Sequence, residues 1–235
     1  WAAVALVGAG GRATLVAAEM AWATAAFVEA PELARVNGFA YLEMQCLALR
    51  AWVAGSNGDH PGMVSAATCA DDVATARGWE SSPLALAARW MRAYGALLRS
   101  EPVEAYRLAR EAMRSGQAAL RPRYVYALRS LQGAAMFDCG RRRAGLQEMQ
   151  RARADLGEVQ LSDEQASVLA VLEHRAAVII GGTHAARGVV AWLAERIGIR
   201  GEVLLMRAWA EQAAGREGAA QRLVEPVLDG TVTPV

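Results

Sequence analysis

Ionic side chains occur deep within several apolar stretches of this 235-residue chain. Glu43, Arg89, Arg129 and the pair Glu173-His174 each lie in such a stretch. Charged groups are rarely buried unless they are paired. Carboxylates accept hydrogen bonds and guanidiniums donate them, so these residues are suited to hold a polar ligand or to pair with other charges of the protein.

Aromatic residues fall in the same stretches and add flat apolar faces. Convergent charges and rings in one groove suit a small polar ligand or a peptide. The predicted ligand-binding residues are Glu43, Arg89, Trp90, Tyr94, Tyr126, Arg129, Glu173, His174 and Trp209. The alternative interpretation is a ladder of internal salt bridges between neighbouring structural repeats, with the rings in the core.

A second chemical motif lies near the start of the chain. Gly8-Ala9-Gly10-Gly11-Arg12-Ala13 follows an apolar run and fits G-x-G-x-x-A, and Glu29 follows at a distance suited to a ribose ligand. Glycines in this pattern let a backbone approach a pyrophosphate in nicotinamide cofactors. No further βαβ unit follows, so the favoured interpretation is a turn between two helices.

Other catalytic signatures are missing from the sequence. His60, His174 and His184 share no metal-ligand spacing with a cysteine or carboxylate on one helix face, and no phosphate-binding loop or nucleophile elbow is present. Asp71-Asp72 and Arg141-Arg142-Arg143 are expected on solvated helix surfaces. The chain is therefore predicted not to be an enzyme and to hold neither a metal nor a cofactor.

Composition favours a folded protein outside the membrane. The chain is 54% hydrophobic and 21% charged, and its net charge of +1 gives no global attraction to nucleic acid or lipid. Three widely spaced cysteines indicate a reducing compartment, so a cytoplasmic location is expected. Because the chain begins with Trp1 rather than methionine, we expect a piece of a longer protein whose partner domains are missing.

Apolar periodicity predicts helices in pairs along most of the chain. Ser100, Gly140 and Gly215 each mark the turn between a long apolar helix and an amphipathic one. Helices are predicted at 13–27, 31–53 and 61–77. In the rest of the chain, the first helix of each pair is predicted at 83–98, 123–137, 163–180 and 202–214. The second helix of each pair is predicted at 103–115, 142–156, 185–197 and 219–228. The period of about 40 residues predicts one domain over 1–235, a right-handed all-α solenoid of antiparallel pairs similar to tetratricopeptide repeats.

The C-terminal part resembles a known family. Residues 207–220, Arg-Ala-Trp-Ala-Glu-Gln-Ala-Ala-Gly-Arg-Glu-Gly-Ala-Ala, and 224–230, Val-Glu-Pro-Val-Leu-Asp-Gly, are similar to the end of the tetratricopeptide-like region of large ATP-dependent LuxR-family transcription regulators of the maltose-activator type. The resemblance implies an effector-sensing role for this chain. It also implies that ATP and DNA bind only in an NTPase domain and a helix-turn-helix domain that this chain lacks.

The leading functional hypothesis is an effector-sensing domain that binds a small molecule, such as a sugar, in a concave groove. Its other expected partners are the remaining domains of the parent regulator, with no membrane contact and with a homo-oligomer as an open alternative. The second hypothesis is a tetratricopeptide-type scaffold that binds a protein partner. A remote third is an NAD-binding enzyme built on Gly8–Ala13.

Overall fold

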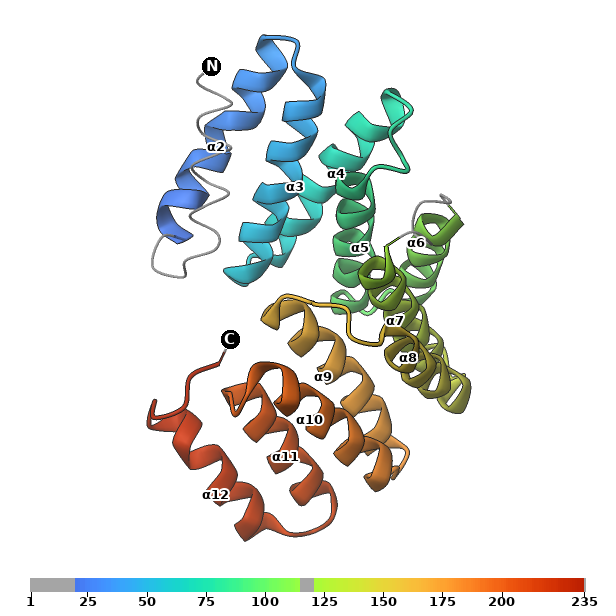
Figure 1. The fold of residues 1–235 in the computed structure, drawn as a ribbon, viewed down its shortest axis with the longest axis vertical. Helices are drawn as coiled ribbons and strands as arrows, with labels where there is room; N and C mark the ends of the chain where they lie inside the picture. Colours follow the sequence, from blue (N-terminus) through green and yellow to red (C-terminus); the bar gives the residue numbers. More distant parts are fainter. Residues whose placement is uncertain (1–19, 115–120, 235) are drawn as a thin grey trace. The chain divides into compact units, whose positions relative to one another are not determined.

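The computed structural model describes residues 20–114 and 121–234, with side chains from residue 27 onward. Throughout these ranges every regular element is an α-helix, so the all-α prediction is confirmed. Figure 1 shows the helices in chain order, which are α2 (Met20–Val36), α3 (Ala40–Ser56), α4 (His60–Ala76), α5 (Pro83–Leu98), α6 (Pro102–Arg114), α7 (Pro122–Asp138), α8 (Arg142–Leu156), α9 (Asp163–Ile179), α10 (Thr183–Ile197), α11 (Gly201–Ala213) and α12 (Glu217–Leu228).

The chain divides into two compact units, 1–124 and 125–235, whose boundary falls inside α7. In unit 1, each helix from α2 to α6 packs on the next, and α3 also contacts α5. In unit 2, α8 to α12 pack in the same consecutive manner, and α9 also contacts α11. Contact between successive first helices, as well as within each pair, is the packing of a helical-repeat solenoid. The prediction of a single domain is not tested by this division.

The boundaries of the later helices agree closely with the sequence prediction. The helices α5 and α8 have the predicted bounds, and the first helices α5, α7, α9 and α11 begin about 40 residues apart. Ser82 caps α5 as predicted, because its Oγ accepts a hydrogen bond of 3.2 Å from the Ala85 amide while Pro83 occupies the first turn. Local stop and start signals therefore suffice for this part of the chain.

The earlier helices differ from the prediction. We expected one helix to begin at Pro31 and to continue to Val53, but Pro31 lies inside α2 and the chain turns at Asn37-Gly38. Gly38 has a φ of 72°, and the Gly38 and Phe39 amides bond back to Arg35 and Ala34. This closed turn ends α2. Pro31 does not end the helix, because it removes only one backbone hydrogen-bond donor from α2. The Gly8–Ala13 motif and residues 13–19 of the helix predicted at 13–27 lie outside the described residues, and the rest of that helix lies within α2.

One turn type connects successive helices in both units. A residue with positive φ stands two positions before each of six helices, and its amide and the following one bond to carbonyls in the last turn of the preceding helix. This is the Schellman motif, which satisfies the free carbonyls of a helix end. The six residues are Gly38, Gly58, Ser100, Gly140, Gly181 and Gly215. The small residues that mark the repeat in the sequence therefore act through their backbone conformation.

Small side chains also decide how closely the helices approach. At the crossing of α7 and α8, a Cβ added to Gly145 would lie 2.4 Å from the Gly133 carbonyl oxygen. A Cβ on Gly133 would lie 2.7 Å from the Gly145 oxygen. These two backbones touch, so neither position accepts a side chain without a shift of the helices. Alanine fills many of the other buried positions, such as Ala67, Ala88 and Ala170.

Within the described ranges, none of the helices combines the length and the apolar character needed to cross a bilayer.

Ser100 offers a test of the turn, because it is the non-glycine residue with a φ of 60°. We expect Ser100→Gly to raise the free energy of unfolding by about 0.5–1 kcal/mol, since a left-handed conformation costs an L-residue more than glycine loses in backbone entropy. Gly140→Ala is the matched reverse change. A Cβ there meets no atom within 4 Å, so its expected loss of about 1 kcal/mol reports backbone strain alone. Urea unfolding of both variants measures the change in the free energy of unfolding. A change of the same sign in both variants would contradict the role assigned to the left-handed conformation.

Candidate functional site

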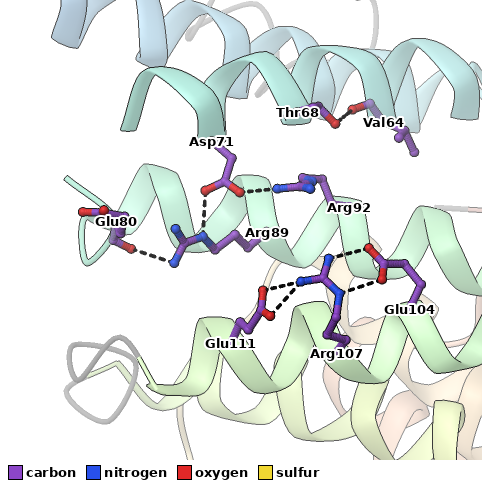
Figure 2. Close-up of polar contacts among 9 residues, drawn as sticks. All are labelled: Val64, Thr68, Asp71, Glu80, Arg89, Arg92, Glu104, Arg107 and Glu111. Carbon is purple, nitrogen blue, oxygen red and sulfur yellow. Dashed lines mark hydrogen bonds and ion pairs between the residues drawn. The ribbon is translucent and has the colours of Figure 1, made fainter. Parts of the chain in front are cut away.

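In unit 1, the predicted residue Arg89 pairs with a buried carboxylate. Asp71 on α4 is 7% exposed, and its Oδ1 accepts a 2.7 Å bond from Arg89 Nε on α5. Arg92, one turn further along α5, pairs with the other Asp71 oxygen, and Arg89 Nη1 also reaches the Glu80 carbonyl at 3.4 Å. Figure 2 shows Asp71 pointing from α4 toward both arginines. Asp71 was expected on a solvated surface, and that expectation is wrong.

The predicted aromatic residues of unit 1 form a ring cluster on α5, the helix that also carries Arg89. Trp90 and Tyr94, one turn apart on α5, stack with their centroids 5.9 Å apart and their planes 7° apart. Trp52 on α3 packs against Trp90 at 6.3 Å. Trp90 is buried, and its Nε1 has no hydrogen-bond acceptor among the described residues. Burial raises the pKa of Tyr94 above its usual value.

Glu43 lies apart from this cluster in the first turn of α3, where it is half-buried. Its charge acts on Arg35 and on the buried thiol of Cys46. Burial raises the pKa of that thiol to about 11, and Glu43 adds to the shift. The structure thus brings Arg89, Trp90 and Tyr94 together on one helix and leaves Glu43 outside the group.

In unit 2, the predicted residue Glu173 also pairs with an arginine on the preceding helix. Glu173 on α9 is 1% exposed, and its carboxylate accepts bonds of 2.9 and 3.0 Å from Arg153 on α8. Burial raises the pKa of Glu173, and the Arg153 guanidinium opposes that rise. The fork of two parallel bonds is the strongest geometry for an arginine and a carboxylate.

The two buried pairs occupy the same place in the repeat with their charges exchanged. Asp71 lies thirteen residues after the left-handed Gly58, and Arg153 lies thirteen after Gly140. Each projects from the second helix of one pair to the first helix of the next, where it meets Arg89 and Arg92 or Glu173. We call these contacts the inter-repeat ion pairs. They match the internal salt bridges of the alternative interpretation.

Arg129 forms a different ion pair, within one helix pair rather than between two. From α7 its Nε donates to Glu148 at 2.6 Å, and its Nη1 donates to Asp155 at 2.5 Å, both on α8. Arg129 is therefore held by two carboxylates, and its pKa is raised chiefly by the bond to Glu148. Arg129 Nε and Nη1 therefore already donate hydrogen bonds within the protein.

Tyr126 lies near the Glu173 ion pair and carries an unpaired hydroxyl. The residue is 1% exposed, and its ring meets Trp192 of α10 edge to face, with the centroids 5.9 Å apart. Its Oη and the Ser130 Oγ lie near each other, but neither forms a hydrogen bond of good geometry among the described residues. Burial, reinforced by the charge of Glu173, raises the pKa of Tyr126 strongly.

His174 is fully buried on the neighbouring face of α9. Its ring meets Trp209 of α11 at 5.6 Å, edge to face, and neither ring nitrogen has a partner among the described residues. Burial lowers the pKa of His174 from 6.5 to about 4, so the ring is neutral at pH 7. Two consecutive polar residues are buried here because α9 contacts α8, α10 and α11.

Sequence reasoning missed Arg153, Trp192 and Arg196, which lie close to Glu173 or Tyr126. Two guanidiniums lie over the Trp192 ring, with Arg196 4.7 Å and Arg153 5.9 Å from its centroid. All three lie on the second helix of a pair, outside the apolar stretches that mark the first helices. Their position relative to the turn glycine is the signal that would have identified Arg153. We call Tyr126, Ser130, Arg153 and Glu173, together with His174 on the neighbouring face of α9, the buried polar cluster.

No model of a known protein family matches the chain, and no curated protein matches it significantly. In the described part of the chain, no group of three or more His, Cys, Asp or Glu side chains is arranged to hold a metal ion.

The inter-repeat ion pair of unit 1 has a matched control nearby. Asp71→Ala leaves Arg89 and Arg92 without their carboxylate in a largely buried place, and we expect a loss of about 2–3 kcal/mol in the free energy of unfolding. Glu104→Ala removes an exposed carboxylate from Arg107, which keeps Glu111 (Figure 2), so a loss below about 1 kcal/mol is expected. Urea unfolding compares the two, and similar losses would contradict a special role of Asp71.

The buried imidazole predicts a dependence of stability on pH. The unfolded chain protonates His174 below about pH 6.5, whereas the folded protein resists protonation down to about pH 4. Stability from this residue is therefore full above pH 6.5 and falls by roughly 3 kcal/mol as the pH drops to 4. Glu173 contributes with the opposite sign, because its raised pKa favours the folded state at lower pH.

Comparison of variants isolates the imidazole. We expect His174→Gln to flatten the difference in unfolding free energy between pH 7 and pH 4.5, while His60→Gln, at an exposed position, leaves it as in the unaltered protein. Chemical unfolding at the two pH values provides the measurement. An unchanged pH slope in His174→Gln would show that this histidine is not the buried neutral group.

Proposed function

We propose that this chain is the effector-sensing helical-repeat region of a bacterial transcription regulator of the LuxR family, located in the cytoplasm. The effector is a small polar molecule, such as a sugar, that binds at the buried polar cluster of unit 2. Two observations support this assignment, namely the helix pairs of about 40 residues and the resemblance of residues 207–230 to that family. ATP and promoter DNA would bind to other domains of the regulator.

The observation that carries the proposal is the set of buried polar atoms without partners. Among the described residues of unit 2 they include Tyr126 Oη, Ser130 Oγ and both ring nitrogens of His174. Each such atom costs about 1–3 kcal/mol when it is left unpaired, and most buried polar groups in folded proteins are hydrogen-bonded. A molecule that supplied partners to them would recover that cost.

The chemistry of the cluster suits a hydroxylated ligand. Hydroxyl groups and a neutral imidazole each donate and accept hydrogen bonds, as sugar hydroxyls do. The Glu173 carboxylate accepts, and the Arg153 guanidinium donates. Trp192 and Trp209 border the cluster with flat apolar faces, which suit the apolar face of a sugar ring.

The burial of the cluster suits a sensor more than a simple carrier. A ligand reaches Tyr126 and His174 only in an arrangement where the helices that cover them have moved, because both residues are almost fully buried. The unpaired atoms raise the free energy of the closed arrangement and so narrow its gap to the open one. A ligand that binds only the open arrangement then shifts the population by its differential affinity, which is the requirement for effector control.

Tyr126→Phe provides the sharpest test, because it removes one unpaired oxygen and keeps the ring against Trp192. We expect a sugar in a metabolite panel to raise the melting temperature of the full chain, with about 2.7 kcal/mol gained at 100 times its dissociation constant. Tyr126→Phe should weaken that ligand at least tenfold while stability stays equal or rises. Tyr106→Phe on α6 in unit 1 is the control and should bind normally.

Two results would overturn the proposal. The first is the absence of any small polar molecule that changes melting temperature or tryptophan fluorescence. The second is unchanged affinity in Tyr126→Phe.

The alternative function is a protein-docking scaffold. Phe39 and Tyr41, at the turn from α2 to α3, are each 51% exposed, which is unusual for large aromatic side chains and favours a partner surface on unit 1. The same thermal assay separates the two functions. Stabilisation by a protein partner and by no small molecule would assign the chain as a scaffold.

A further inference from the structure

Unit 2 contains a hollow that the function proposed above does not use. It lies between α10 and α11, at the start of α12, and has a volume of about 150 Å³. Its apolar lining includes Ala186 and Val190, both buried residues of α10. Its polar lining comes from Thr183, Arg187, Arg207, Glu211 and Arg216. None of these side chains was singled out by type or spacing in the sequence.

The hollow carries an excess of positive charge. Three guanidiniums and one carboxylate give it a formal charge of +2, against +1 for the whole chain. Glu211 pairs with Arg216, whose Nη2 lies 3.1 Å from Glu211 Oε1. This pair and the charge of Arg187 lower the pKa of Glu211, so its carboxylate stays ionised and holds Arg216 in place. Arg187 and Arg207 form no ion pair with any described carboxylate.

Guanidiniums bind oxyanions through paired N–H donors. Arg187, Arg207 and Arg216 come from three segments, namely α10, α11 and the turn before α12, so they approach the hollow from different directions. Donors that converge in this way suit the three outer oxygens of a tetrahedral dianion better than the two oxygens of a planar carboxylate. The Thr183 hydroxyl, in the first turn of α10, adds a further donor.

The volume limits what the hollow can hold. Pockets for whole drug-sized ligands measure about 300–1,000 Å³, whereas one water molecule takes about 30 Å³ of liquid. At about 150 Å³ the hollow has room for one small anionic group, with the rest of its carrier outside. We propose that it binds the phosphate group of a small phosphorylated molecule.

This site is separate from the buried polar cluster. Arg207 and Trp209 are two residues apart on α11 and so lie on nearly opposite faces, with Trp209 against His174 and Arg207 at the hollow. A bound dianion would relieve the repulsion among three arginines and link α10, α11 and α12. Phosphate binding therefore does not depend on a sugar at the cluster, and the two ligands can be tested separately.

The test titrates the full chain with inorganic phosphate and pyrophosphate at constant ionic strength, followed by calorimetry and melting temperature. We expect saturable binding that Arg187→Gln or Arg207→Gln weakens at least tenfold. Both arginines are exposed and unpaired, so these variants should fold as the unaltered protein does. Arg151→Gln, an exposed arginine on α8, is the matched control and should bind normally. Tyr126→Phe should also bind phosphate normally, which separates this site from the proposed sugar site.

Three results would overturn the assignment. Binding that is not saturable at constant ionic strength would show only diffuse charge attraction. An equal loss in Arg151→Gln and Arg207→Gln would show that the hollow is not the site. Tighter binding of succinate than of either phosphate probe would replace the phosphate group with a dicarboxylate.

Discussion

The left-handed residue in each of the six Schellman turns is the constraint on which the rest of the structure depends. It lets the chain reverse direction while the last carbonyls of one helix are satisfied, so the next helix begins two residues later. The turn therefore sets the positions of the residues on the helix that follows it. The inter-repeat ion pairs show this directly, because both lie thirteen residues after the turn glycine. The repeat is thus defined by backbone conformation first and by side chains second.

Each unit then uses its buried polar groups in a different way. In unit 1, Asp71 is saturated by two arginines, and the neighbouring Trp90 leaves one donor unpaired. In unit 2, Glu173 is satisfied by Arg153, while Tyr126 and His174 have no hydrogen-bond partner in the described part of the chain. A helix that contacts three others, as α9 does, buries more of its circumference than an amphipathic pattern provides for. On α9 this burial includes the imidazole of His174, which has no partner among the described residues.

Much of the fold could be predicted because its signals are local. Ser82-Pro83, Gly140 and the apolar periodicity were enough to place α5 and α8 with their observed bounds. Pro31 misled because a proline is compatible with both the start and the interior of a helix, and only the turn at Gly38 decides between them. The ion-pair partner of each charged residue was harder to predict from the sequence. The pair Asp71–Arg89 and the pair Arg129–Asp155 join different helices, so they depend on how each helix is rotated in the stack. Alanine-rich surfaces say little about that rotation.

The exchange of charges between the two inter-repeat ion pairs has a consequence for the order of the repeats. If α4 met α9, Asp71 would face Glu173, and if α8 met α5, Arg153 would face Arg89 and Arg92. Like charges in a buried place repel, so either wrong stacking would be penalised. The sign of the charge at a single buried position thus distinguishes the correct neighbouring helix from an incorrect one. The buried charges thereby favour the observed order of these helices over the two wrong ones.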